Sequence, residues 1–549
     1  MSRIEGIVSR SGLTMGRSLR WTSACLIVVA CLCCALVSDL QPLGARAPTT
    51  KQTREKSQAG LKAAVKKTQA EFEVKLEEIA KSCDAQDLKL EAAEIRLLAK
   101  PLKADVLQGE NLPRQVQLEI PKDLPEAERT WRQQLRTLQK EHADKVFEKA
   151  KTALNAGMIS FAYELVREVA RHNPDHVFAR KLLGYVRHGD EWVTMYAEKM
   201  LKKKHVLTEK YGWLRQEYVE RYEQGERFCN GKWMSAAREA ELRRDFEHAW
   251  MIQTDHYKIY TNHSLEMGVE LGRHLEDFYR IFFQTFAGML SSRDQLKKLF
   301  TDAAAAGGSA SDPFVVHYYR TEDEYVTRLQ KKLRQPVKGT SGLYLSGLRN
   351  VPDERVAHFF HNLEATEEER LATMFHEATH QLFSEAYTSN PKVGVDSDFW
   401  VVEAIACYME SFHRKGDVFS LGDPHYIRFQ NAQFRLVNDG YYVTLQHLSS
   451  MGMDTFQSHP KRSLNYSQGS GLAHFFMHYE DGVYRDAFIT YLAAIYGRNP
   501  SRRPNPSSLS ELTEVPNPKL DQQYRDYMWQ LDTGLDIKRA KVAPAKVAQ

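Results

Sequence analysis

The chain has 549 residues, of which 42% are hydrophobic and 27% are charged, a composition that excludes a disordered chain and a multi-span membrane protein. Its 75 basic and 71 acidic side chains leave a net charge of only +4, which excludes the strongly basic surface typical of nucleic-acid binders. At about 150 residues per domain, the length predicts more than one folding unit.

Residues 1–47 have the pattern of an export signal. Four arginines precede an apolar run from Ala24 to Val37, which has the length of a signal-peptide core, whereas a spanning helix needs about 20 residues. We expect an exported protein, periplasmic or extracellular, with cleavage near Ala47 favoured over retention as a membrane anchor. A lipobox-like segment ends at Cys31, whose lipidation is the alternative. Membrane contact is expected only through this segment.

The seven cysteines do not predict a disulfide framework, because four of them lie in the apolar run. Cys83 and Cys229 could form a disulfide in an oxidising compartment. Cys407 is expected to be buried, since it lies within a helical pattern.

The helical N-terminal half is divided into a linker with charged helices over residues 48–125 and a helical domain over 126–250. In the second part, apolar residues predict two amphipathic helices broken near Gly157, and Asn173-Pro174-Asp175 ends the second one. A further helix starting near Ala179 makes the region weakly similar to a tetratricopeptide pair, and such helices are candidate protein-binding surfaces. The aromatic segment from Trp192 to Trp233 is interpreted as a connector and packing surface.

Residues 251–532 are expected to form an α+β domain with a small mixed sheet, followed by a disordered tail over 533–549. The predicted strands are His256–Thr261, Phe314–Tyr319, Ser341–Leu345 and Arg355–Phe360. A long helix, Glu266–Phe286, is predicted between the first two of them. The fold class is therefore mostly α, with an α+β domain at the C-terminal side.

The sequence His376-Glu377-Ala378-Thr379-His380 is an H-E-x-x-H motif, and on a helix its two histidines point from one face toward one metal ion. A capping box formed by Thr366 and Glu369 and a helical apolar pattern predict that helix. The structural alternative is that both histidines are ordinary core residues.

Catalytic zinc takes three protein ligands and keeps one position open for water. Glu403 is the candidate third ligand, because it lies among apolar residues of a second predicted helix, where an unpartnered carboxylate would be costly to bury. Asp396 or Asp398 is expected to cap this helix, which should end near Gly416. The alternative is a surface glutamate.

The H-E-x-x-H motif, followed by W-x-x-E-A-x-A-x-Y-x-E from Trp400 to Glu410, resembles the gluzincin zinc metallopeptidases, which include thermolysin and aminopeptidase N types. The resemblance covers about residues 255–496. It implies a thermolysin-like, peptidase MA-like domain in which an edge strand, either Ser341–Leu345 or Arg355–Phe360, binds extended substrate above the zinc. No G-A-M-E-N-like segment is present, which leaves aminopeptidase activity unsupported and the choice between endo- and exopeptidase open.

The resemblance also implies that Tyr466, in a Y-x-x-G segment, donates its hydroxyl to the tetrahedral intermediate, with His474 as the alternative donor. Thermolysin-like enzymes carry an acidic residue four positions after the ligand glutamate, whereas this chain has Cys407 there. A carboxylate that orients a histidine must then come from Glu410, Asp396 or Asp398.

The leading hypothesis is a zinc peptidase acting on peptide or protein substrates. His376, His380 and Glu403 hold Zn²⁺, and Glu377 acts as the general base. The alternative is an inactive, envelope-tethered binding or scaffold protein that retains a peptidase-like fold. The sequence predicts no nucleic-acid partner and no particular oligomeric state.

Overall fold

The structure is a computed structural model, and it describes residues 51–99, 106–110, 112–302, 312–333, 337–348, 351–385, 392–497 and 508–536. The expected leader over 1–47, with Cys31, lies outside these residues, as does most of the expected tail over 533–549. From Glu55 onward the chain forms one compact unit. Over the described ranges, no helix combines the length and the hydropathy needed to cross a bilayer.

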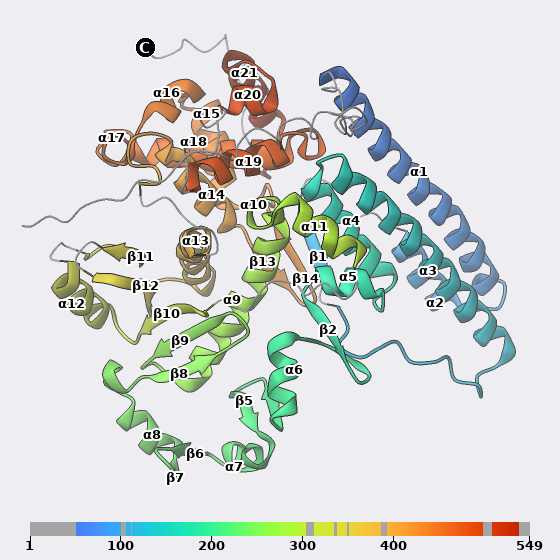
Figure 1. Ribbon diagram of the computed structural model, residues 1–549, viewed down its shortest axis with the longest axis horizontal. Coiled ribbons are helices and arrows are strands. Elements are labelled where there is room, and N and C mark those ends of the chain that lie inside the picture. The colour runs from blue at the N-terminus through green and yellow to red at the C-terminus, as the bar shows by residue number, and fades with distance from the viewer. Residues whose placement is uncertain are drawn as a thin grey trace, which may run out of the picture. The chain divides into compact units, whose positions relative to one another are not determined.

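The helical N-terminal half is built on a hairpin of two long helices, as the sequence predicts. Its helices are α1 (Lys51–Asp84), α2 (Lys89–Leu98), α3 (Glu126–Asn155), α4 (Ile159–His172) and α5 (Val177–Leu182). Gly157, with φ of 81°, makes the left-handed turn between α3 and α4. Helices α1, α3 and α4 lie side by side (Figure 1), and Phe72 and Leu76 of α1 share a core with Trp131 of α3.

The weak tetratricopeptide resemblance does not extend beyond this hairpin. Helix α5 has six residues, and the chain then enters a β-hairpin at Tyr185 instead of a second long helix. Stacked helical repeats need about three units to bury a continuous core, and the described residues contain one.

The segment interpreted as a connector is in fact a series of three β-hairpins, each followed by a short helix (Figure 1). Its elements are β2 (Tyr185–His188), β3 (Glu191–Thr194), α6 (Met195–Lys202), β4 (His205–Thr208), β5 (Gly212–Arg215), η1 (Gln216–Tyr218), α7 (Val219–Glu223), β6 (Glu226–Cys229), β7 (Lys232–Ser235) and α8 (Ala236–Leu242). Trp192, Trp213 and Trp233 recur at intervals of about 20 residues, each early in the second strand of its hairpin. No strand was predicted in this segment, because strands of four residues leave too short an alternation to detect.

A five-stranded mixed sheet follows the hairpins, in the order β11-β12-β10-β9-β8. Its strands are β8 (Trp250–Gln253), β9 (Tyr257–Thr261), β10 (Phe314–Tyr319), β11 (Gly342–Leu348) and β12 (Val351–Phe360). The three inner strands are parallel, whereas β8 and β11 pair antiparallel at the two ends of the order. All four predicted strands are confirmed, and β11 rather than β12 is the edge strand on its side.

Helices pack on this sheet and on one another to complete the C-terminal part. They are α9 (Leu265–Thr285), α10 (Ala287–Leu290), α11 (Arg293–Thr301), α12 (Glu322–Leu333), α13 (Glu367–Glu385), α14 (Phe399–Met409), α15 (Ile427–Val437), α16 (Leu445–Ser450), α17 (Met453–Gln457), α18 (Arg462–Gly482), α19 (Arg485–Tyr496), α20 (Leu509–Thr513) and α21 (Asn517–Gln530); the short turn η2 (Phe246–His248) precedes β8. Helix α13 packs against β11, β12 and α14, so the two helices predicted to carry the chemistry are neighbours. The chain is thus mostly helical with several small sheets.

A three-stranded sheet joins distant parts of the sequence, because β1 (Leu107–Glu110) pairs with β14 (Val418–Leu421), which pairs with β13 (His413–Lys415). Gly109 allows this pairing, since an added Cβ would overlap the ring of Phe419. The segment predicted as a linker therefore supplies a strand to the part that carries the H-E-x-x-H motif.

The three cysteines in the described part of the chain, Cys83, Cys229 and Cys407, are free and buried. The disulfide considered for Cys83 and Cys229 does not form. The burial predicted for Cys407 is confirmed.

Candidate metal centre

Helix α13 carries the H-E-x-x-H motif and begins at the predicted capping box. Thr366 Oγ1 accepts a hydrogen bond from the N–H of Glu369 at 3.2 Å, and Glu369 Oε2 accepts one from the N–H of Thr366 at 2.8 Å. The expected core face is buried at Met374, Phe375, Ala378, Leu382 and Phe383, with Leu371 partly buried. These contacts fix the rotation of α13, and His376 and His380 come together as their i, i+4 spacing requires.

Helix α14 brings Glu403 to the two histidines. The helix begins directly after Asp398, whose φ of 58° and contacts with Ser397 and Tyr491 replace the predicted capping hydrogen bond. It ends at Met409, and Gly416 instead forms the turn of the following hairpin. The predicted end near Gly416 was wrong because Ser411 and Phe412 turn the chain within one helical turn of Glu410.

The three candidate ligand atoms lie close enough to hold one ion. His376 Nε2 is 3.2 Å from His380 Nε2 and 3.4 Å from Glu403 Oε2, and the distance from His380 Nε2 to Glu403 Oε2 is 4.0 Å. A point equidistant from atoms with these separations lies about 2.1 Å from each, which is the length of a zinc–nitrogen or zinc–oxygen bond. Two imidazoles and one carboxylate are also a donor set that zinc accepts, so these residues fit the expected ion.

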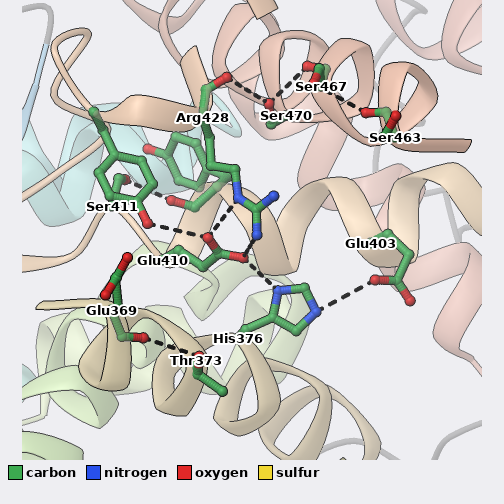
Figure 2. Close-up of polar contacts among 12 residues, drawn as sticks. Glu369, Thr373, His376, Glu403, Glu410, Ser411, Arg428, Ser463, Ser467 and Ser470 are labelled. Atoms are coloured by element: carbon green, nitrogen blue, oxygen red, sulfur yellow. Dashed lines mark hydrogen bonds and ion pairs between the residues drawn. The ribbon is translucent and has the colours of Figure 1, made fainter. Parts of the chain in front are cut away.

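Glu410 orients the ring of His376 from the side opposite Glu403 (Figure 2). Its Oε1 lies 2.8 Å from His376 Nδ1, and Arg428 donates two hydrogen bonds to its carboxylate at 2.7 and 2.8 Å. Tyr426 Oη donates a further hydrogen bond to it at 3.2 Å. Of the three carboxylates left open by the sequence, Glu410 is therefore the one that contacts His376, and it directs Nε2 toward the centre.

The charges of these groups are strongly coupled. Burial lowers the pKa of His376, but contacts with Cys407, Glu403 and Glu410 outweigh burial and hold that pKa well above its ordinary value. Burial instead dominates at His380 and lowers its pKa. Burial would raise the pKa of Glu403, yet the two histidines keep it below its usual range. A proton and a cation are alternative partners for His376 Nε2, so acid should displace a bound ion.

Glu377 reaches from α13 to the edge strand β11. The backbone N–H of Tyr344 donates a hydrogen bond to Glu377 Oε2 at 2.9 Å. The strand and the helix approach closely at Gly342, where an added Cβ would lie 2.9 Å from the ring of Phe359 and 3.0 Å from Glu377 Cγ. The carboxylate of Glu377 is thus held between the ligand helix and the edge of the sheet.

Tyr466 lies beside Glu403, whereas His474 does not face the centre. A hydrogen bond from Tyr466 contributes to the low pKa of Glu403, and burial followed by the charge of Glu403 raises the pKa of Tyr466 itself. Gln457 also donates a hydrogen bond to the Tyr466 hydroxyl at 3.0 Å. The two ring nitrogens of His474 contact Gly422 O at 3.0 Å and Tyr527 Oη at 2.8 Å.

Tyr496 is a residue that sequence reasoning missed. It is 3% exposed, its ring stacks on Phe383 of α13, and its hydroxyl has no hydrogen-bond partner among the described residues. Burial raises its pKa, with a further contribution from the charge of Glu403 and an opposing one from His376. A buried hydroxyl without a partner can still donate a hydrogen bond. Sequence reasoning could not connect Tyr496 with the H-E-x-x-H motif, because the two are far apart along the chain.

Comparison with protein-family models finds no match for this chain, and comparison with curated proteins finds none either.

Proposed function

We propose that the chain is a zinc-dependent peptidase of the gluzincin type, with a thermolysin-like catalytic domain built on the sheet β8–β12 and helices α13 and α14. The observation that carries this proposal is the convergence of His376, His380 and Glu403 on one point about 2.1 Å from each ligand atom. The position of Glu377 on the same helix, next to the edge strand, supports peptide hydrolysis as the reaction.

In this proposal His376, His380 and Glu403 hold the zinc ion. When bound, zinc supplies Lewis acidity, which lowers the pKa of water and polarises a carbonyl group. Glu377 takes a proton from the attacking water and delivers it to the leaving amine as the carbon–nitrogen bond breaks. Glu410 keeps the Nδ1 proton of His376 in place, so that Nε2 remains available as a ligand atom.

Substrate is proposed to bind as an extended chain along β11. An edge strand presents backbone N–H and C=O groups that can pair with a peptide, and β11 also contacts the general base. A cavity of about 540 Å³ lies at the start of this strand, where Ser341 lines it together with Phe359, Thr373 and Met374, and we propose that it receives a substrate side chain. Tyr466 and Tyr496 are the proposed donors to the charge that develops on the carbonyl oxygen.

The decisive test replaces Glu377 by glutamine in the full-length chain. This variant should retain wild-type zinc content, measured by mass spectrometry, and lose cleavage of casein and of a peptide library. Glu368→Gln, an exposed position on α13, is the matched control and should cleave normally. Full activity of Glu377→Gln would remove the general-base role, and a wild-type protein with zinc but without cleavage would favour the scaffold alternative.

Export remains part of the proposal. When the full-length chain is expressed and the exported protein is sequenced from its N-terminus, the mature protein should begin near residue 48. A mature protein that begins at a lipid-modified Cys31 would instead indicate lipoprotein processing.

A further inference from the structure

A second cluster of metal-ligand side chains is buried in the helical N-terminal half. His142 comes from α3, whereas Glu168 and His172 come from α4, where their i, i+4 spacing places them on one face. Both histidines are 3% exposed, and Phe72 of α1 covers them, with its ring 3.9 Å from that of His142. This cluster contains none of the residues assigned to the centre on α13 and α14.

The cluster is compact enough to hold one ion. One nitrogen from each histidine and one oxygen of Glu168 lie within 4.8 Å of one another. Three atoms with separations no larger than this have a common point within about 2.8 Å of each, so changes of less than 1 Å would reach the bond lengths of a zinc ion. His172 Nε2 lies 2.8 Å from Glu168 Oε1, a hydrogen bond that a bound ion would replace, with the two atoms moving slightly apart.

Two buried nitrogens in this cluster lack hydrogen-bond partners in the part of the chain that the structure describes. They are His142 Nε2 and His172 Nδ1. An unsatisfied buried polar group destabilises the fold, and a phenylalanine at position 142 would stack on Phe72 without that cost. The packing alone therefore does not explain why an imidazole occupies this position, whereas a cation bound by His142 does.

The charges of the cluster also suit a cation. Burial lowers the pKa of His142 to about 4, which keeps the imidazole neutral and able to donate an electron pair at neutral pH. Burial would raise the pKa of Glu168, but His172 and Arg171 keep it below its ordinary value, so the carboxylate is anionic. A carboxylate together with imidazole nitrogens is a donor set suited to a borderline divalent cation.

We propose that His142, Glu168 and His172 bind a second divalent transition-metal ion, with Zn²⁺ the favoured species, which cross-links α3 to α4 beneath α1. The site is structural in character, because its ligands are buried in the helical half and covered by Phe72. It does not depend on the proposed peptidase activity.

Zinc stoichiometry in the full-length chain tests this site. After saturation and gel filtration, wild type should carry two zinc ions, the double variant His376→Ala/His380→Ala one, and His142→Phe one. His142→Phe keeps the stacking on Phe72, and His447→Gln, at an exposed position, is the control that should keep both ions. Equal zinc content in His142→Phe and wild type would overturn the proposal, whatever the content of the other centre.

A second measurement covers the case in which His142→Phe does not fold. In the His376→Ala/His380→Ala chain, added Zn²⁺ should raise the melting temperature progressively with concentration, because an ion that binds only the folded state stabilises it. Co²⁺ in the same chain should give visible absorption bands typical of nitrogen and oxygen ligands. A melting temperature unaffected by Zn²⁺ in this chain would overturn the proposal independently.

Discussion

Replacing Glu410 by alanine should weaken zinc binding while leaving all three proposed ligands in place. In the structure the Glu410 carboxylate lies 2.8 Å from His376 Nδ1 and accepts two hydrogen bonds from Arg428. A hydrogen bond to a charged group contributes about 1.5–3 kcal/mol, and its loss leaves the His376 ring without its orienting partner. At about 1.4 kcal/mol per tenfold change, the dissociation constant for zinc should rise about 10- to 100-fold.

The loss of fold stability in this variant should be smaller than for most buried ion pairs. The Arg428 side chain is 39% exposed, so water can solvate its guanidinium once the carboxylate is removed. Glu410→Gln keeps an oxygen that accepts the His376 N–H, and it should weaken zinc binding less than alanine does. Comparing the two substitutions separates the loss of charge from the loss of ring orientation.

The assay is competition for zinc against a chromophoric chelator at pH 7, with circular dichroism to confirm folding. Glu368→Ala, on the exposed side of α13, controls for removal of a glutamate. A dissociation constant for Glu410→Ala within twofold of wild type would refute the assignment of Glu410 as the residue that orients His376.

Three further predictions concern residues around the centre and the core. Burial lowers the pKa of His474 to about 4, so below about pH 6.5 the unfolded chain binds a proton that the folded chain does not. The free energy of unfolding should therefore fall by up to about 3 kcal/mol between pH 7 and pH 4. Urea titrations of His474→Gln should show a smaller fall, and a fall equal to that of wild type would contradict this. Tyr466→Phe and Tyr496→Phe should each lower kcat by about 100-fold at unchanged zinc content if the hydroxyl donates to the oxyanion, whereas unchanged kcat excludes that residue. Gly342→Ala should destabilise the fold by about 1–3 kcal/mol in denaturant titrations, because its Cβ would press on Phe359, and an unchanged midpoint would refute the close approach.

The elements that carry the centre could be predicted from sequence because their signals are local. The capping box at Thr366, the buried face of α13 and the i, i+4 histidines all depend on helical geometry within a few turns. Glu403 could be singled out because a carboxylate among apolar residues needs a partner. The structure brings it within 4.0 Å of both histidine nitrogens.

Other features depend on contacts between distant residues and left no such signal. Glu410 could not be separated from Asp396 and Asp398, because only the packing of α14 on α13 decides which carboxylate reaches His376 Nδ1. The pairing of β1 with β14 and the position of Tyr496 depend on tertiary packing in the same way. The hairpin series is marked in the sequence by the regular recurrence of Trp192, Trp213 and Trp233. Its strands were not predicted, because four residues are too few to show an alternating pattern.

Helix α14 and the residue that follows it provide the carboxylates on both sides of the His376 ring. Glu403 lies within α14 and Glu410 directly follows it, seven positions apart, which is about two turns and brings both carboxylates to nearly the same face. One inserted or deleted residue between them would rotate one carboxylate by about 100° relative to the other. Any force that slides or turns α14 as a whole therefore moves the proposed ligand and the orienting carboxylate together, so a perturbation of this helix far from the ion would change zinc affinity and ring orientation in one step.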